Sequence, residues 1–519
     1  MQTLKYPTGQ QDFVYLRENG YVYVDKTDII HHLVNNPKYV FLARPRRFGK
    51  SLLLSTIETF FKGRKELFKG LAIEHLEKEW RKHPVFHLEL SGMERGNFES
   101  LKDELDRQIR EWEEEYGIVK TADSISSRFR DLINKSCKIT GEKVVILVDE
   151  YDNPLINSLE DSRLHDRCKD LLKAVYSAIK GMDRYIRFAM ITGVSRFSKT
   201  SVFSGLNNLN DISFDNRYAS LCGFTLPEIR RFLWQGVEEL ALNKKVTPEI
   251  VVEMLKEQYD GYHFSRECPD IYNPFSLLNA LDKSSIGYYW ILSGAPTFLI
   301  DQLKKSGNTF LKIFTSEETE YTLGTLDVAL FSPVALLYQT GYLTIKSYNP
   351  ESEFYTLGVP NKEVNYGLFV SLLSDYQRNE EKDNLITASA MRVALMSGEP
   401  QKFLLLLQEF YEAIPYNLHP NKYELNFEKI LYSLLRLIDL DVRSEVELSN
   451  GRIDLLITTG KYVYILELKM DSTPEKALSQ IREKGYTDAF RSDYRKIFLI
   501  GVNFSSESRN IDSWVIESE

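Results

Sequence analysis

Four short apolar runs constrain the first 225 residues of this chain more than any other feature. Each run is continuously apolar rather than alternating, and long charged segments with helical spacing separate one from the next. Strands of a parallel sheet covered on both faces have this pattern, because both of their sides are buried. The sequence therefore predicts a first α/β domain, residues 1–225, with strands at YVFLA (39–43), VFHLEL (85–90), KVVILVDE (143–150) and IRFAMITG (186–193).

The rest of the chain divides into three further segments. At about 100 to 200 residues per domain, 519 residues imply about three domains. Residues 226–325 are mostly helical in pattern and predict a lid. Residues 326–418 begin with an apolar helix and two strand-like runs around an Asn-Pro turn, which predicts a winged-helix-like element and a helical connector. Residues 419–519 alternate strand-like runs with amphipathic helices, so we expect a second α/β domain.

Composition excludes several classes of protein. Hydrophobic residues make up 43% of the chain and charged residues 27%, as in folded globular proteins. The four cysteines are far apart and form no C-x-x-C pair, which argues against a disulfide scaffold and structural zinc. The sequence has neither a signal-peptide pattern nor an apolar run of about 18 residues. We expect a cytoplasmic protein without a membrane partner.

The triplet Gly49-Lys50-Ser51 follows an apolar run and opens a helical pattern. A loop at this place can present backbone N–H groups and a helix N-terminus to phosphate oxygens. Lys50 would neutralise the β- and γ-phosphates of ATP, and Ser51 would hold Mg²⁺. The later strand ending VVILVDE supplies Asp149 to orient the metal and Glu150 to polarise the attacking water.

The first half of this loop departs from the usual G-x-x-x-x-G-K-S pattern. Arg44 stands at the first glycine position and is followed by Pro45, which has no N–H to offer. Arg47 and Phe48 complete the loop that we expect to border the nucleotide. Two alternatives stay open: an ordinary helix start beneath an acidic strand end, and a nucleotide site without hydrolysis.

The strand after the acidic pair ends in Thr192 and leads into Ser195 and Arg196. Thr192 or Ser195 is the candidate sensor of the γ-phosphate. Arg196 and Arg217 are candidate arginine fingers that would stabilise a phosphoryl transition state. A salt bridge is the commoner role of such arginines.

A second constellation lies in the last hundred residues. Asp454 sits in GRIDLLI, and YVYILELK places Glu467 and Lys469 two apart, on one face of a strand. If the two strands form a hairpin, the three side chains converge. Two carboxylates form a hard-oxygen site for Mg²⁺, with Mn²⁺ as a substitute, and the ammonium would assist phosphodiester cleavage.

Burial supports this reading over a solvated ion pair, which is the alternative. Glu467 interrupts an otherwise apolar run, and a buried charge needs a partner or a metal. Glu424 could add a carboxylate, and Gln480, Lys484 and Tyr486 follow on the next helix. The whole chain carries a net charge of −9, so bulk charge does not mark a nucleic-acid binder, although a local basic cleft stays open.

An ordered set of motifs resembles a bacterial family of predicted AAA-ATPase-like proteins with a C-terminal domain of the PD-(D/E)XK nuclease superfamily. The resemblance implies Walker roles for Lys50, Ser51, Asp149 and Glu150, and it makes an arginine at position 44 usual. It also implies a restriction-endonuclease-like core with Asp454, Glu467 and Lys469 at the signature positions. The matching segments are YPTGQQDFVYLRENGYVYVDKTDII, ARPRRFGKS, ILVDEYDNPL, TGVSRFSKTSVFSGLNNLNDIS, YDGYHFS, YNPFSLLNAL, GRIDLLI, YVYILELKMD, ALSQIREKGY and IGVNFS.

The resulting hypothesis is an ATPase whose nucleotide state controls a Mg²⁺-dependent nuclease. Nucleic acid is then the expected partner of the C-terminal domain, with DNA, RNA and the oligomeric state left open. A signalling or scaffold NTPase whose C-terminal domain binds without cutting is the main alternative, and a ring-forming motor is the third. For YDGYHF we expect packing between lid and ATPase domain, with a sensor role for His263 as the alternative. The YVDKT segment, residues 23–27, could border the adenine.

Overall fold

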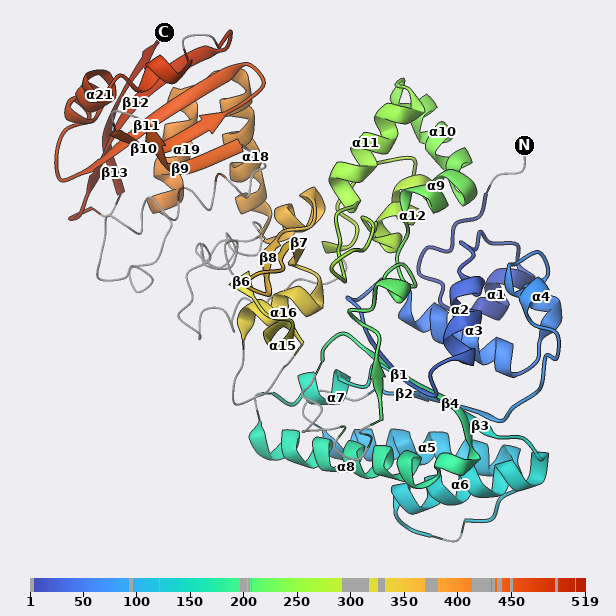
Figure 1. The fold of residues 1–519 in the computed structure, drawn as a ribbon. Coiled ribbons are helices and arrows are strands. Elements are labelled where there is room, and N and C mark those ends of the chain that lie inside the picture. Colours follow the sequence, from blue (N-terminus) through green and yellow to red (C-terminus); the bar gives the residue numbers. More distant parts are fainter. Residues whose placement is uncertain are drawn as a thin grey trace. The chain divides into compact units, whose positions relative to one another are not determined.

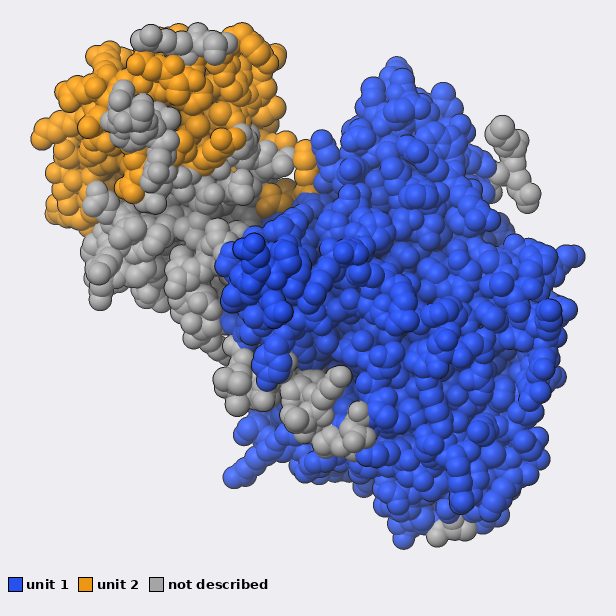
Figure 2. All heavy atoms as spheres, in the orientation of Figure 1, with its two compact units in different colours: residues 1–290, 313–361 blue, residues 291–312, 362–519 orange. Residues whose placement is uncertain are grey.

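A computed structural model gives the fold (Figure 1). It describes residues 4–92, 97–120, 122–159, 161–196, 203, 206, 208–291, 317–324, 332–368, 381–412, 431, 435, 441–448, 451–490, 493–508 and 510–519. The chain forms two compact units (Figure 2). Unit 1 comprises Met1–Trp290 and Ile313–Asn361, and unit 2 comprises Ile291–Lys312 and Lys362–Glu519.

A parallel sheet forms the centre of unit 1. Its five strands lie in the order β2-β3-β4-β1-β5, and every neighbouring pair is parallel. The four runs expected from the sequence form four of these strands, and β1, β3 and β4 are almost wholly buried. The strands are β1 (Tyr39–Ala43), β2 (Val85–Glu89), β3 (Val144–Asp149), β4 (Ile186–Gly193) and β5 (Asn210–Asp211).

Helices cover both faces of this sheet. In Figure 1, α5, α6 and α8 lie on one face, and α1 to α4 lie on the other. Polar side chains start the long helices by accepting free N–H groups, as Asn97 does for α5 and Ser124 for α6. The helices are α1 (Phe13–Glu18), α2 (Thr27–Asn35), α3 (Lys50–Phe61), α4 (Ile73–Leu76), α5 (Phe98–Glu115), α6 (Ile125–Thr140), α7 (Asn153–Ile156) and α8 (Ser162–Gly181), with short 3₁₀ turns at Lys65–Phe68, Asp183–Tyr185 and Asn216–Tyr218.

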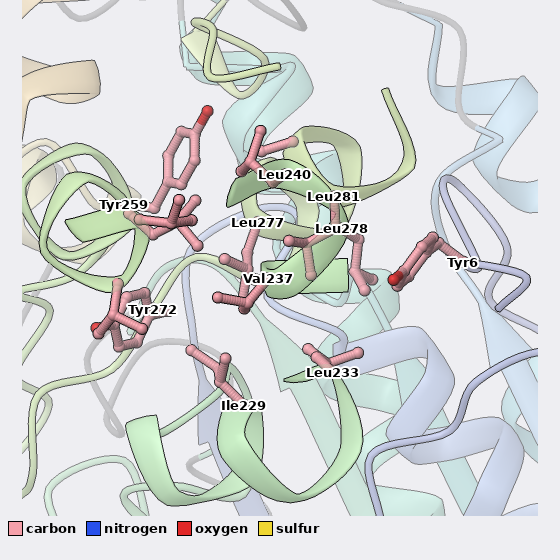
Figure 3. Close-up of a cluster of buried hydrophobic side chains, with 14 of the residues drawn as sticks. Tyr6, Ile229, Leu233, Val237, Leu240, Tyr259, Tyr272, Leu277, Leu278 and Leu281 are labelled. Atoms are coloured by element: carbon pink, nitrogen blue, oxygen red, sulfur yellow. The ribbon is translucent and has the colours of Figure 1, made fainter. Parts of the chain in front are cut away.

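A separate hydrophobic core holds the helical lid together. Its buried side chains come from α9 (Leu226–Phe232), α10 (Trp234–Lys244), α11 (Pro248–Tyr259) and α12 (Pro274–Asp282). Figure 3 shows Tyr6 from the N-terminal segment pointing at this cluster, beside Leu278 and Leu281. The lid core is therefore completed by residues that precede the sheet in the sequence.

A small element follows the lid within unit 1. An apolar helix leads into two antiparallel strands around the expected Asn-Pro turn, and a third short strand pairs beside them in the order β6-β8-β7. We call this the wing. Its elements are β6 (Glu317–Glu318), α15 (Glu320–Leu323), α16 (Pro333–Thr340), β7 (Thr344–Asn349) and β8 (Phe354–Gly358).

Unit 2 contains the second α/β fold. Its sheet has the order β13-β12-β11-β10-β9, and only β11 and β12 are parallel to each other. α21 packs on the central strands and buries Leu478 and Ile481 against them. The elements are α18 (Glu381–Ser397), α19 (Pro400–Glu412), β9 (Asp441–Leu448), β10 (Gly451–Thr458), β11 (Tyr462–Met470), α21 (Pro474–Glu483), β12 (Lys496–Ser505) and β13 (Asn510–Ser518), with a 3₁₀ turn at Tyr486–Phe490.

The fold class expected from the sequence is confirmed: one parallel α/β sheet with helices on both faces, and a second α/β fold at the C-terminus. Of the amphipathic helix that the sequence predicts over residues 426–438, the structure describes only Leu431 and Leu435, and both are buried. Among the helices that the structure describes, none is long and apolar enough to cross a membrane.

Candidate nucleotide-binding and metal-binding sites

The loop between β1 and α3 closes around the ammonium group of Lys50. Nζ of Lys50 donates to the main-chain oxygens of Arg44 and Pro45, each at 3.0 Å. Gly49 precedes α3 with φ 94°, in the left-handed region that favours glycine. The free N–H groups of the first turn of α3, which carries Ser51, therefore face the loop.

Arg44, at the position of the usual first glycine, points away from the loop and into the core. Its guanidinium donates to the main-chain oxygens of Ala43 and Ser213, both at 2.9 Å, and lies 4.2 Å from the centre of the Phe264 ring. Only 2% of Arg44 is exposed. A side chain at this position is thus accommodated without entering the space in front of the loop.

Arg47 and Phe48 direct their side chains to the lid. The ring of Phe48 packs edge-on against Tyr262 at 4.8 Å, and the guanidinium of Arg47 lies 4.9 Å from the ring centre of Phe275. The main-chain oxygen of Phe48 accepts a hydrogen bond of 3.2 Å from Gly223. A nucleotide in this loop would meet the main chain of Phe48, since its side chain is buried against the lid.

Asp149 and Thr192 meet at the carboxyl ends of two neighbouring strands. β4 lies between β1 and β3, so Thr192 stands between the loop and the acidic pair. The hydroxyl of Thr192 donates to Oδ1 of Asp149 at 2.7 Å, and Glu150 N–H donates to the same oxygen at 2.9 Å. Glu150 itself adopts a left-handed φ of 51°.

Burial shifts the pKa values of Lys50 and Glu150 in opposite directions. It lowers the pKa of Lys50, while the carboxylates of Asp149 and Asp152 raise it. Burial also raises the pKa of Glu150, and the neighbouring Asp149 raises it further. A carboxyl group with a raised pKa beside a buried cation is a common property of sites that move protons.

The candidate sensor and finger residues separate into different environments. Ser195 is buried, and its N–H donates to Asp152 at 2.6 Å. Arg196 forms an ion pair of 2.6 Å with Asp211, and both side chains are largely buried. Arg217 pairs with Asp215 on the surface. Each of the two arginines already has a carboxylate partner in its own chain.

In unit 2, β10 and β11 form the hairpin on which convergence of the acidic residues depends. Leu455 pairs with Leu466, so Asp454 and Glu467 are the next positions along the two strands. Oδ2 of Asp454 accepts the N–H of Leu468 at 2.9 Å. Lys469 donates to Oε1 of Glu467 at 3.1 Å. The structure therefore brings together all three side chains expected from the sequence.

Glu467 is the buried member of this cluster. Only 1% of it is exposed, and its Oε2 has no hydrogen-bond partner among the residues that the structure describes. Burial, together with the charge of Asp454, raises the pKa of Glu467 to about 7. An unpartnered buried carboxylate oxygen beside a second carboxylate fits a hard divalent cation.

The other predicted neighbours have different outcomes. Gln480 on α21 donates to Oε1 of Glu467, and so joins the cluster. Tyr486 donates to the main-chain oxygen of Arg452 at 2.6 Å. Lys484 is exposed at the end of α21. Glu424 lies outside the described residues.

Comparison with known proteins finds a family match for each of the two domains that carry these sites. Residues 7–203 match the family described as predicted AAA-ATPase, and residues 422–514 match the PD-(D/E)XK nuclease superfamily. The "uncharacterized protein in vnfD 5'region" of Azotobacter chroococcum mcd 1 is 35% identical over 528 residues, covering 100% of both chains. The chain belongs to this family of predicted AAA-ATPases with a PD-(D/E)XK nuclease domain. The resemblance seen in the sequence is thereby confirmed.

Two motifs of this AAA-ATPase-like protein connect its parts rather than face the loop. His263 bonds through Nδ1 to the main-chain oxygen of Ile345 in the wing at 3.0 Å, and through Nε2 to Asp270 at 2.8 Å. In the YVDKT segment, Lys26 forms an ion pair of 2.6 Å with Glu228 of the lid. Both contacts join the lid to another element of unit 1.

Sequence reasoning did not single out two residues of unit 1 that contact the nucleotide loop or its strands. Asp152 accepts hydrogen bonds from the end of β4, and Trp290 donates to the loop at Arg46. The spacing in DEYD, three residues after Asp149, is a signal that could have identified Asp152. Trp290 lies 244 residues from its partner, and no local pattern points to it.

Proposed function

We propose that this protein is an ATP-controlled nuclease, in which residues 1–225 bind and hydrolyse ATP and residues 419–519 cleave phosphodiester bonds of nucleic acid. The observation that carries the nuclease assignment is the buried carboxylate of Glu467. Within the described part of the chain one of its oxygens has no partner, and the other accepts from the ammonium group of Lys469. If Glu467 had only a structural role, nothing would offset the free-energy cost of burying that charged oxygen in a central strand.

Asp454 and Glu467 would hold Mg²⁺, or Mn²⁺ in its place. The cation would supply Lewis-acid stabilisation of the phosphate and a more acidic bound water. Lys469 extends from the buried Glu467 toward the surface, with 29% of its side chain exposed against 1%. Its ammonium would orient a water or stabilise negative charge on a bound phosphodiester, and its partial exposure supports this role. Gln480 holds the same carboxylate from α21.

In the ATPase domain, Lys50 would exchange its bonds to Arg44 and Pro45 for phosphate oxygens. Ser51 and Asp149 would hold the Mg²⁺ that accompanies ATP. Glu150 would polarise the attacking water, a role that its raised pKa suits. Thr192 would report the γ-phosphate through its hydrogen bond to Asp149.

The proposed control rests on contacts that join the nucleotide loop to the lid segment. Phe48 packs on Tyr262, and Arg46 accepts from Trp290. A change of the loop on ATP binding would therefore move these partners. Ile291, the residue after Trp290, begins unit 2, which also contains the nuclease domain.

The test is cleavage of labelled DNA and RNA by the purified full-length protein in Mg²⁺ or Mn²⁺, with and without ATP. Glu467→Ala and Lys469→Ala should abolish cleavage and leave ATP turnover unchanged. Lys461→Ala, which removes an exposed lysine just before β11, is the matched control and should cut normally. Retained cleavage by Glu467→Ala would refute the metal site. Cleavage that changes neither with ATP nor in Lys50→Ala would refute the proposal that ATP controls the nuclease.

A second function, a nucleotide switch that binds nucleic acid or protein without cutting, is favoured by one observation. The Lys50 ammonium is held by two loop carbonyls, and the loop is packed against lid and wing, as suits a domain that reports occupancy. Tight ATP binding with negligible turnover, and no cleavage in either metal, would support this function over the first.

A further inference from the structure

The turn after β3 is fastened to the end of β4 by the side chain of Asp152. Only 2% of this residue is exposed. Its Oδ2 accepts the N–H of Val194 at 3.0 Å and the N–H of Ser195 at 2.6 Å, and its Oδ1 lies 3.2 Å from the same Val194 nitrogen. Two consecutive amides, immediately after the strand that carries Thr192, therefore point at one carboxylate.

Tyr151 adds a second connection between the same two segments. Its N–H donates to the main-chain oxygen of Thr192 at 3.1 Å, and its hydroxyl donates to the main-chain oxygen of Ser195 at 2.9 Å. Together with the bond of 2.7 Å from Thr192 to Asp149, these contacts join residues 149–152 to residues 192–195 along their length.

Gly193 shows how closely the segments approach. A Cβ at this position would lie 2.5 Å from Oδ1 of Asp152 and 2.6 Å from the ring of Tyr151. Atoms of a folded protein do not come so near without displacement, so the contact requires glycine. Residues 149–152 therefore pack tightly against residues 192–195 at the end of β4.

The chemistry of Asp152 is costly for a residue that serves only packing. A carboxylate buried to this degree loses its hydration, and a neutral side chain would avoid that loss. Burial raises the pKa of Asp152 above its ordinary value, and the N–H groups of Ser195 and Val194 together with the charge of Lys50 offset part of that rise. Asp152 thus interacts electrostatically with Lys50 of the phosphate loop while it holds the end of the strand that carries Thr192.

We propose that Asp152 is a positioning residue for ATP hydrolysis: it fixes the Thr192–Ser195 segment so that the Thr192 hydroxyl and the Asp149 carboxylate keep one geometry in front of the γ-phosphate. This inference rests on the proposed ATPase function. It assigns Asp152 no direct contact with ATP. A positioning role separates binding from turnover, because the phosphate loop remains intact when the strand end is released.

The experiment measures ATP affinity and kcat separately for the full-length protein and for Asp152→Asn. Asparagine keeps the size of the side chain but removes one acceptor and the charge. We expect an ATP Kd within about threefold of the wild type and a kcat lower by roughly tenfold to a hundredfold, because misplacement of a catalytic group by about 1 Å can cost about a hundredfold in rate. Tyr151→Phe, which cuts only the bond to Ser195, should show the same split with a smaller loss.

Asp161→Asn is the matched control. Asp161 also accepts two main-chain N–H groups, from Arg163 and Leu164 at the start of α8, but it lies on the surface. It should change neither Kd nor kcat. Two results would overturn the positioning role while leaving the ATPase proposal intact. One is that the wild type hydrolyses ATP and Asp152→Asn has the same kcat. The other is that Asp152→Asn loses ATP affinity as well as kcat, which would mark Asp152 as a structural residue. Absence of Lys50-dependent turnover in the wild type would overturn the ATPase proposal, and this inference with it.

Discussion

The indole N–H of Trp290 donates a hydrogen bond of 3.1 Å to the main-chain oxygen of Arg46 in the phosphate loop. The Trp290 ring lies 5.1 Å from that of Tyr342, at the corner between α16 and β7. Gly341, the residue before it, fits against Pro45 so closely that a Cβ would lie 2.8 Å from that ring. Two consecutive loop residues are thus held by the lid end and the wing.

Trp290→Phe should speed the association of ATP by about two- to tenfold, which corresponds to the loss of one hydrogen bond of ordinary strength. The reason is that Lys50 must break its hydrogen bonds to the carbonyl groups of Arg44 and Pro45 before it can bind phosphate, and Trp290 holds the adjacent loop residue Arg46 in place. Stopped-flow mixing with a fluorescent ATP analogue measures this rate.

Trp80→Phe is a suitable control for that measurement. It cuts a similar indole bond of 3.1 Å, to the main-chain oxygen of Glu77, away from the loop. An equal acceleration in both variants, or none in Trp290→Phe, would contradict a restraining role for Trp290.

Lys50→Met should weaken ATP binding by roughly a hundredfold or more, because hydrogen bonds from a charged group to phosphate are worth up to about 3 kcal/mol. The melting temperature should fall, because the main-chain oxygens of Arg44 and Pro45 lose their donor and the carboxylates of Asp149 and Asp152 lose a neighbouring positive charge. Calorimetric titration and thermal melting test the two parts.

Lys62→Met provides the comparison for Lys50→Met. Lys62 follows the end of the same helix, is half exposed and pairs with Glu58 at 2.7 Å. It should bind ATP like the wild type. Normal nucleotide affinity in Lys50→Met would remove the basis of the phosphate site.

The sequence predicted those strands whose two faces are both buried, because such strands are continuously apolar. Two strands of unit 2 lack this pattern and were not predicted: β9, DVRSEVEL, and β13, NIDSWVIES. Both lie at the edges of their sheet, and polar residues interrupt the apolar ones along each of them. β5 is only two residues long and carries no periodic signal at all.

The same distinction holds for the sites. Asp454, Glu467 and Lys469 lie on neighbouring strands of one hairpin, so short-range spacing was enough to bring them together. Partners that are far apart in the sequence were not predicted. An example is Gln339 of α16, which accepts the N–H of Arg196 at 2.9 Å although 143 positions separate the two residues. Contacts of this kind depend on how whole elements pack, which local periodicity does not encode.

Asp260→Asn should change how the stability of unit 1 depends on pH. Burial raises the pKa of Asp260 from 3.8 to about 7, with a further contribution from Asp270. The folded protein therefore holds a proton that the unfolded chain releases. The stability linked to this proton is complete below about pH 4 and is lost as the pH rises to about 7, with a slope of at most about 1.4 kcal/mol per pH unit.

Denaturant unfolding between pH 4 and pH 8 measures that slope. Asp260→Asn should flatten it, while Asp282→Asn, which removes an exposed carboxylate from the same lid, should leave it as in the wild type. An unaltered slope in Asp260→Asn would show that the buried carboxyl group is ionised throughout this range.

Divalent metal binding to unit 2 should strengthen with pH up to about 7. Burial and the charge of Asp454 raise the pKa of Glu467 to that value, so below it a cation must displace a proton. One displaced proton makes the affinity rise by up to about tenfold per pH unit, and the rise should level off above pH 7.

Titration of the full-length protein with Mn²⁺ in two buffers of different ionisation enthalpy measures both the affinity and the proton released. Glu467→Gln should abolish binding at this site, and Glu483→Gln, which neutralises an exposed carboxylate on α21, should not. Binding that is independent of pH from 5 to 7 would mean that Glu467 is already ionised, and that the unpartnered oxygen is balanced by Lys469 alone.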